Sequence, residues 1–353
     1  MTKDGSNARK RAAREHAATH QMPYTQALRD TAQPPRARVR PPVPIRTSDT
    51  TLVGHSSRVV GVAFHPDGTM FASAGDRSVR LWDRTTLQTT TVLNTDDSVF
   101  SMAWSPDGAT IAVGCVDGTV TFWTVATGRI ISRTTGANIL ESVAFSPQGD
   151  TAATSGFERH DETPRRRSVA RLWDVATGQD TLLSDRDAEL RQDRLVGHGY
   201  ALAFHPAGRV LAASGETDGS LHLWDLPTRH LTELPGHDGY SIMALDFSPD
   251  GRTLASGGMD DTILLWDTTT WRHTRRIDAP AGLISRMAFS PDGRLLAATG
   301  MDLFAQLWDV RTGEPVAVLL GHDGEIPAFA FSPDGRLLVT GSDDRTLRLW
   351  HFD

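Results

Sequence analysis

The sequence predicts an all-β protein built from seven copies of one small β-sheet unit. Three observations support this prediction: a proline-containing turn recurs, a tryptophan follows each copy after a strand-like stretch, and the repeat is about 42 residues long. The prolines are Pro66, Pro106, Pro147, Pro206, Pro249, Pro291 and Pro333. The tryptophans are Trp82, Trp123, Trp173, Trp224, Trp266, Trp308 and Trp350.

Each unit has the same order of strands and turns. An apolar alternation such as VVGVAF leads into a turn such as SPDG, and a second apolar run such as LLAATG leads through another turn to TLRLW. Proline presets the backbone of a type I turn and glycine suits its exit. These segments predict three short strands, and stretches such as EPVAVLL at 314–320 predict a fourth.

Length and composition exclude several other classes. A chain of 353 residues is longer than one ordinary core supports, and 39% hydrophobic residues without a run of about 20 apolar residues exclude a membrane helix. The single cysteine, Cys115, cannot form an internal disulfide. The first 22 residues lack the apolar stretch of a signal peptide. We therefore expect a cytoplasmic protein.

Charge divides the chain into two parts. Residues 1–46 carry ten basic and three acidic residues, whereas residues 47–353 carry 26 basic and 40 acidic residues. With six prolines between Met22 and Ile45, the start of the chain predicts a disordered basic arm over 1–44, before an ordered domain over 45–353. Only Lys3 and Lys10 are lysines, a bias that suggests a GC-rich, bacterial genome.

Three functions remain open for the arm. It could contact nucleic acid through arginine, offer the stretch Arg38–Pro44 to a polyproline-binding groove, or bind the acidic remainder of the same chain. An acidic body repels phosphate, so nucleic acid is not the expected partner.

The repeated residues resemble the WD-repeat (WD40) family, whose units run from Gly-His to Trp-Asp. The resemblance covers Leu52–Asp353. It implies a seven-bladed β-propeller of four-stranded antiparallel blades. Because the last unit stops after its third strand, residues 45–53 would supply the missing strand and close the ring.

The resemblance also implies a hydrogen-bonded network inside a unit, joining the His, an Asp, a Ser or Thr of the second strand, and the Trp. Units two, three and six lack the His, so their blades are expected to be weaker. The third unit has Arg167 in place of the Asp, while Asp117 and Asp302 remain without an evident reason. The four complete sets are His55, Ser73, Asp76 and Trp82; His198, Ser214, Asp218 and Trp224; His237, Ser256, Asp260 and Trp266; and His322, Thr340, Asp344 and Trp350.

No catalytic, cofactor or metal site is expected. The network histidines lie in different units and cannot converge on a metal. The sequence shows neither a phosphate-binding glycine loop nor a G-x-S-x-G elbow nor HExxH. Cys115 falls on a predicted strand without a nearby His, which favours a packed thiol.

In the resembled family, partners bind the face that carries the His and Asp loops. The third unit adds FERHDETPRRRS, with an arginine triplet that could bind an acidic group or be a solvated loop. Residues on the expected rim could also point into the channel or between blades. The candidates are Arg58, Phe100, Glu141, Tyr200, Met243, Met259, Met301, Glu325 and Asp343, with Arg165, Arg166 and Arg167.

These observations favour a monomeric, non-catalytic platform for a protein or peptide, without a membrane or cofactor. One alternative is a sensor or substrate-recognition propeller that works with a separately encoded kinase, protease or NTPase. A propeller enzyme such as a hydrolase or lactonase is the least favoured.

Overall fold

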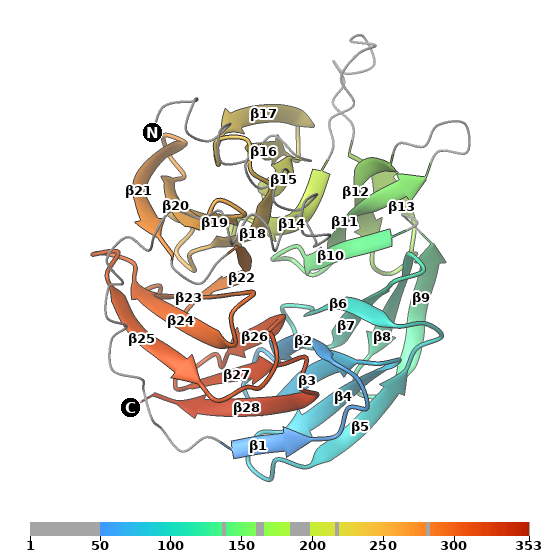
Figure 1. Cartoon of the computed structure of the whole chain (residues 1–353). Helices are drawn as coiled ribbons and strands as arrows, with labels where there is room; N and C mark the ends of the chain where they lie inside the picture. The colour runs from blue at the N-terminus through green and yellow to red at the C-terminus, as the bar shows by residue number, and fades with distance from the viewer. Residues whose placement is uncertain are drawn as a thin grey trace, which may run out of the picture. The chain divides into compact units, whose positions relative to one another are not determined.

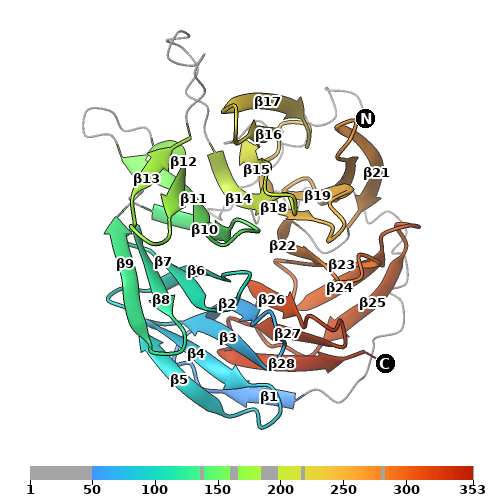
Figure 2. The same cartoon turned by 180° about the vertical axis from the view of Figure 1, so that it is seen from behind.

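The computed structural model describes residues 50–135, 139–159, 166–183, 198–215, 219–279 and 283–352. All of them belong to one compact unit, Val43–Asp353. Over these ranges, 28 strands form seven four-stranded antiparallel sheets arranged as a ring, seen in Figure 1 and from behind in Figure 2. The predicted all-β, seven-bladed propeller is confirmed. The predicted arm, residues 1–44, lies outside the described residues.

The blades are numbered in chain order, and each runs from the centre of the ring outward. Blade one contains β2 (Val59–Phe64), β3 (Met70–Gly75), β4 (Ser78–Asp83) and β5 (Thr89–Asn94); blade two, β6 (Val99–Trp104), β7 (Thr110–Cys115), β8 (Thr119–Thr124) and β9 (Arg129–Thr135). Blade three contains β10 (Ile139–Phe145), β11 (Thr151–Arg159), β12 (Arg166–Asp174) and β13 (Asp180–Leu182); blade four, β14 (His198–Phe204), β15 (Val210–Gly215), β16 (Ser220–Asp225) and β17 (His230–Pro235).

The remaining three blades complete the ring. Blade five contains β18 (Ile242–Phe247), β19 (Thr253–Gly258), β20 (Thr262–Asp267) and β21 (Arg272–Asp278); blade six, β22 (Ile284–Phe289), β23 (Leu295–Gly300), β24 (Phe304–Asp309) and β25 (Pro315–Leu320). Blade seven contains β26 (Ala328–Phe331), β27 (Leu337–Gly341) and β28 (Thr346–His351), with β1 (Thr50–Val53) as its outermost strand.

The first and last described strands close the ring together. β1 pairs antiparallel with β28, with Thr50 opposite Leu349 and Val53 opposite Thr346. The predicted closure is therefore confirmed, with a described strand that is shorter than the expected 45–53. Arg84 of blade one also donates a hydrogen bond to the Asp334 carboxylate of blade seven at 2.8 Å.

The proline-containing turns hold the first and second strands of a blade together. In blade five, Ser248 Oγ donates to Asp250 Oδ1 at 2.7 Å and accepts from Thr253 N at 2.9 Å. Gly251 has a φ of 71°, in the left-handed region that glycine adopts without strain. The repeated SPDG sequence is thus explained by local hydrogen bonds.

The aspartate of each Trp-Asp pair caps the turn between the third and fourth strands. Asp267 Oδ1 accepts from Thr269 N at 3.0 Å and from Thr270 N and Oγ1 at 2.7 and 2.9 Å. Hydrogen bonds from Thr270 lower the pKa of Asp267 and keep it ionised. A side chain that satisfies turn N–H groups in this way has a structural role.

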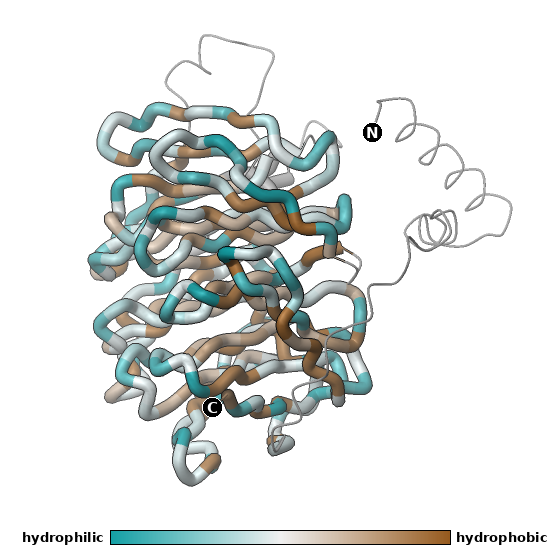
Figure 3. The backbone as a smooth tube through the Cα atoms, turned by 90° about the vertical axis from the view of Figure 1, so that its left-hand side faces the viewer, coloured by the Kyte–Doolittle hydropathy of each residue, from teal (hydrophilic) through white to brown (hydrophobic). Residues whose placement is uncertain are grey.

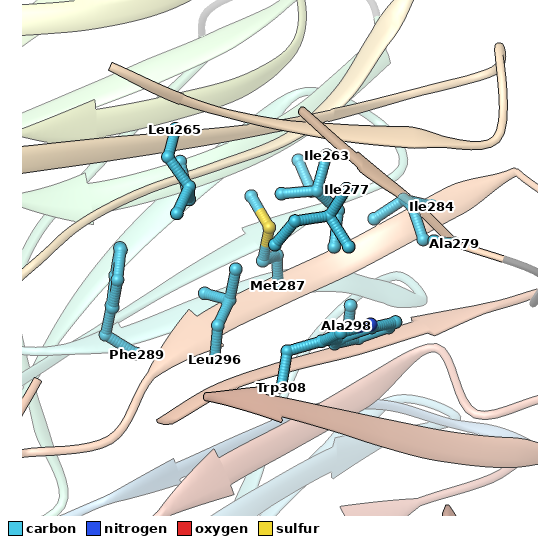
Figure 4. Close-up of a cluster of buried hydrophobic side chains, with 12 residues drawn as sticks. Ile263, Leu265, Ile277, Ala279, Ile284, Met287, Phe289, Leu296, Ala298 and Trp308 are labelled. Atoms are coloured by element: carbon cyan, nitrogen blue, oxygen red, sulfur yellow. The ribbon is translucent and has the colours of Figure 1, made fainter. Parts of the chain in front are cut away.

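The hydrophobic core is divided into layers between neighbouring blades. Figure 4 shows one layer, in which Ile263 and Ile277 of blade five lie beside Met287 of blade six, while Phe289 lies on the side of Leu265. Gly257 is needed in this layer because a Cβ there would lie 2.4 Å from Ile284 Cγ2. In Figure 3, hydrophobic segments run along the strands, while hydrophilic residues are frequent at the turns. Each blade is therefore stabilised mainly by its neighbours.

The described residues contain no helix with the length and apolar character needed to cross a membrane.

Candidate functional site

One face of the ring carries two loops from each blade: the loop before the first strand and the loop between the second and third strands. In blades one, five and seven these loops bring a buried His against an Asp. The His Nδ1 to Asp oxygen distances are 3.0 Å for His55 and Asp76, 2.8 Å for His237 and Asp260, and 2.7 Å for His322 and Asp344. This side of the ring is called the His–Asp face below.

The network continues from the His to the core. In blade five, Ser256 Oγ lies 2.8 Å from His237 Nε2 and 2.9 Å from Trp266 Nε1. An indole N–H can only donate and a carboxylate can only accept. Each group therefore donates a hydrogen bond to the next: Trp266 to Ser256, Ser256 to His237, and His237 to Asp260. This order places the His237 proton on Nδ1. Equivalent contacts link His55, Ser73 and Trp82, and His322, Thr340 and Trp350.

In blades one and seven, the directions of the pKa shifts favour a neutral His and an ionised Asp. Burial lowers the pKa of His55 and His322, although the neighbouring carboxylates act in the opposite direction. Burial acts to raise the pKa of Asp344, but hydrogen bonds from Thr346 and His322 outweigh it and lower the pKa to about 2. The hydrogen bonds link the loops of this face to the buried Trp of the same blade.

Blade four does not contain the hydroxyl that the sequence assigned to it. Leu211 lies opposite Trp224, as Phe71 lies opposite Trp82, so Ala213 is the counterpart of Ser73. Ser214 is one residue further along and faces the other side of the sheet, where its Oγ accepts from Ala201 N at 3.1 Å. The assignment of Ser214 to the network is corrected on this ground. The side chain of His198 and the whole of Asp218 lie outside the described part.

Blade two shows the result of losing the network. Val113 occupies the hydroxyl position, and within the described residues the buried Trp123 Nε1 has no hydrogen-bond partner. Asp117 nevertheless has a local function, because its Oδ1 accepts from Thr119 N at 2.8 Å and holds the turn. This bond explains why an aspartate persists without a histidine.

Sequence reasoning missed a further set of hydroxyls. Thr262 Oγ1 donates to Asp260 at 2.8 Å, and Thr346 Oγ1 donates to Asp344 at 2.6 Å. In blade one, Ser56 donates to Asp76 from both N and Oγ, at 2.9 and 2.6 Å. In blades five and seven, the recurrence of Thr two residues after the Asp was the available signal, whereas in blade one the bonded Ser56 directly follows His55.

Three candidate rim residues are β-bulge residues on innermost strands. The pairing register is interrupted between Val99 and Ser101, which leaves Phe100 unpaired, and the same interruption occurs at Glu141 and Met243. All three are partly exposed. A bulge re-aims its side chain, so these residues share a position that regular alternation does not predict.

Glu141 of blade three lies close enough to Arg286 of blade six for their charges to interact. Burial lowers the pKa of Arg286 in blade six, and the charge of Glu141 in blade three opposes that effect. Because these blades are not neighbours, their innermost strands approach one another only across the centre. The alternative that some candidates face the channel therefore has support at this residue.

The other candidates are dispersed around the face. Arg58, Glu325 and Asp343 are exposed, and Met259 and Met301 are partly exposed. The arginine triplet is not a simple loop: Arg166 and Arg167 belong to β12, where they pair with Arg159 and Glu158. Their side chains, the side chain of Tyr200 and the whole of Arg165 lie outside the described part.

Two features of the described residues bear on metal binding and nucleophilic chemistry. In the part of the chain that the structure describes, no group of three or more His, Cys, Asp or Glu residues is arranged to hold a metal ion. Burial raises the pKa of the Cys115 thiol to about 11, which disfavours the nucleophilic thiolate. A hollow of about 370 Å³ lies on the opposite face, beside the turns at Pro249 and Pro291.

Comparisons with known proteins agree with this architecture. The family model described as WD domain, G-beta repeat matches residues 46–83, 87–124, 191–225, 228–267, 271–309 and 313–351. It leaves the third unit unmatched, although β10–β13 form a blade there.

Three curated relatives show the extent of the similarity. The chain is 28% identical to Autophagy-related protein 16 of Arabidopsis thaliana over 209 residues, 58% of this chain and 38% of that protein. It is 29% identical to Small ribosomal subunit protein RACK1y of Oryza sativa over 194 residues, 54% of this chain and 52% of that protein. It is 27% identical to Transcription initiation factor TFIID subunit 5 of Caenorhabditis elegans over 219 residues, 59% of this chain and 30% of that protein.

The matched region thus spans about a third to a half of each of these relatives. Together, the six matched repeats and the seven four-stranded blades identify the family: this chain belongs to the WD-repeat proteins.

Proposed function

We propose that the protein is a non-catalytic platform that binds a protein or peptide partner on the His–Asp face. The observation that carries the proposal is the row of bulge residues on the innermost strands. Phe100 and Met243 are partly exposed apolar side chains on a rigid scaffold. Aromatic residues and Met are enriched at the centres of protein interfaces.

The similarity to WD-repeat proteins supports the same role. The names of two relatives describe subunits of larger assemblies, a small ribosomal subunit protein and a subunit of TFIID. We extend to this chain only the general property of assembling with other proteins. The proposal includes that the protein is monomeric and acts in the cytoplasm.

The test compares the wild-type protein with a Phe100→Ala, Met243→Ala double variant as bait in the native host. Arg336→Ala, an exposed residue of a proline-containing turn on the opposite face, is the matched control. We expect the double variant to lose at least one reproducible protein partner that wild type and control retain. Unchanged partners for a folded double variant would contradict the proposal, as would turnover of an ester, lactone or peptide by purified protein.

A further inference from the structure

Blade six has lost two polar members of the network, the His and the hydroxyl, while Asp302 and Trp308 remain. The backbone N–H of Ala279 bonds to Asp261 O, as that of His237 bonds to Gly219 O, so Ala279 replaces the histidine. The pairing of Leu296 with Trp308 places Ala298 at the hydroxyl position of the second strand. The two positions that hold the His and the hydroxyl in blades one, five and seven are therefore both alanine in blade six.

The same blade exposes apolar side chains on the His–Asp face. Leu303 is 48% exposed and Leu320 is 54% exposed, while Met301 and Phe304 are partly exposed. Phe304 lies directly opposite Leu320 in the pairing of β24 with β25, which brings Leu303 beside the same pair. These four residues are called the blade-six patch.

The corresponding positions are more polar in the other units. Counted back from the Trp of each unit, the position of Leu303 is polar or glycine in all six other units, and that of Phe304 is Ser or Thr in five. The other described cross-strand pairs at this edge each contain a polar residue: Ser78 with Asn94, Thr119 with Thr135, Ser220 with Pro235, Thr262 with Asp278, and Thr346 with Val53. The patch is thus a specific departure from the repeat, and clustered exposed apolar residues are typical of interaction sites.

Carboxylates lie next to the patch, on blade seven. Asp323 follows Leu320 by three residues, a separation of at most about 10 Å along the chain. Glu325 and Asp343 are joined by a backbone hydrogen bond of 2.9 Å. All three acids are exposed, against one exposed cation, Arg345, in the same loops. A partner that covers the patch therefore meets a predominantly negative border.

We propose that the blade-six patch and the blade-seven carboxylates together bind an extended basic peptide, with a bulky apolar side chain over Leu303 and Leu320 and a Lys or Arg two or three residues away. The patch supplies the area removed from water, and the carboxylates select the charge and register of the peptide. This inference rests on the proposed function and names the partner chemistry for one part of the same face.

The test selects peptides from a random display library on the immobilised full-length protein. We expect enriched sequences that combine Leu, Phe, Met or Trp with Lys or Arg within three residues. The affinity of a selected peptide should fall at least tenfold in the patch variant, which combines Leu303→Asp with Leu320→Ser. It should fall several-fold in a second variant that combines Asp323→Asn, Glu325→Gln and Asp343→Asn. Added salt should weaken wild-type binding.

Ile130→Asp is the matched control, because Ile130 is 49% exposed on the outer strand of blade two. All variants must keep the wild-type melting temperature; if Leu303→Asp unfolds the protein, Leu303→Ser replaces it. Peptides that are acidic, or that remain bound to the patch variant but are lost with Phe100→Ala, Met243→Ala, would overturn the inference and leave the proposed function standing. Failure to select any peptide would count against both.

Discussion

The carboxylate Oδ2 of Asp246 accepts a hydrogen bond of 2.7 Å from the backbone N–H of Phe289, across the boundary between blades five and six. The aligned position of the other six innermost strands is alanine throughout: Ala63, Ala103, Ala144, Ala203, Ala288 and Ala330. One boundary between blades therefore contains an acid where the repeat specifies a small apolar side chain.

This acid should make stability depend on pH. Although Asp246 keeps some solvent exposure, burial of its carboxyl raises the pKa to about 7, against opposing hydrogen bonds from Phe289 and Phe247. The folded protein then binds more protons than the unfolded chain between about pH 4 and 7, so this residue costs stability as pH rises through that range. The effect is complete above about pH 7.

Asp246→Ala removes this cost. We compare the free energy of unfolding of the variant with that of wild type at pH 5 and at pH 8. The difference in favour of the variant should be larger at pH 8 than at pH 5, by at most about 3 kcal/mol. Urea unfolding at the two pH values measures the change, with Asp238→Ala, an exposed carboxyl before the same blade, as control. An equal difference between Asp246→Ala and wild type at both pH values would contradict the assigned titration.

The sequence predicts the repeat because its side chains recur at regular spacing, and it predicts the ring closure because the last unit has only three strands of its own. It does not predict where the pairing register between the first and second strands of a blade shifts. Ser73, Ser256 and Thr340 each lie seven residues after the proline of their unit, whereas Ser214 lies eight residues after Pro206. The assignment of Ser214 rests on residue type and not on this spacing, and the pairing of Leu211 with Trp224 confirms Ala213 at the equivalent position. The bond from Asp246 to Phe289 was also hidden, because its donor is a backbone N–H, 43 residues away, that no side-chain pattern marks.

The hydroxyls of two threonines should have opposite effects on stability. Thr340 Oγ1 bonds to His322 Nε2 at 2.7 Å and accepts from Trp350 Nε1 at 2.9 Å. Thr340→Val leaves two buried polar groups unsatisfied and should cost about 2–4 kcal/mol. Thr299 is also fully buried, but its Oγ1 has no partner within the described residues.

Thr299→Val should therefore be neutral or stabilise the protein by up to about 1 kcal/mol. Denaturant unfolding of both variants provides the comparison. Each variant is a control for the other, because both replace a threonine hydroxyl by a methyl group. Equal destabilisation by the two substitutions would show that the network bonds do not determine the cost.

Cys115 should react slowly in the folded protein. The residue is only 3% exposed, and burial followed by the charge of Asp117 raises the thiol pKa to about 11. At pH 8, labelling by a disulfide reagent should be at least 100-fold slower than in urea, since the thiolate fraction is about 0.001 and access requires opening. Because the chain has one cysteine, all labelling by the reagent reports on Cys115. Rapid stoichiometric labelling of the native protein would contradict the packed position.

Removal of β1 should open the ring at blade seven. Without it, β28 loses the pairing of four residues and presents an unpaired edge, and Leu52 no longer packs against the cluster that contains Leu347 and Leu349. We expect deletion of residues 1–53 to lower the melting temperature by roughly 5 °C or more relative to deletion of residues 1–49, and to promote aggregation seen by light scattering. Leu52→Asp, which keeps the backbone pairing but loses the apolar contact, should have an intermediate effect. If the two deletions melt together and remain monomeric, β1 does not stabilise the ring, because the shorter deletion differs from the longer one only by the closing strand.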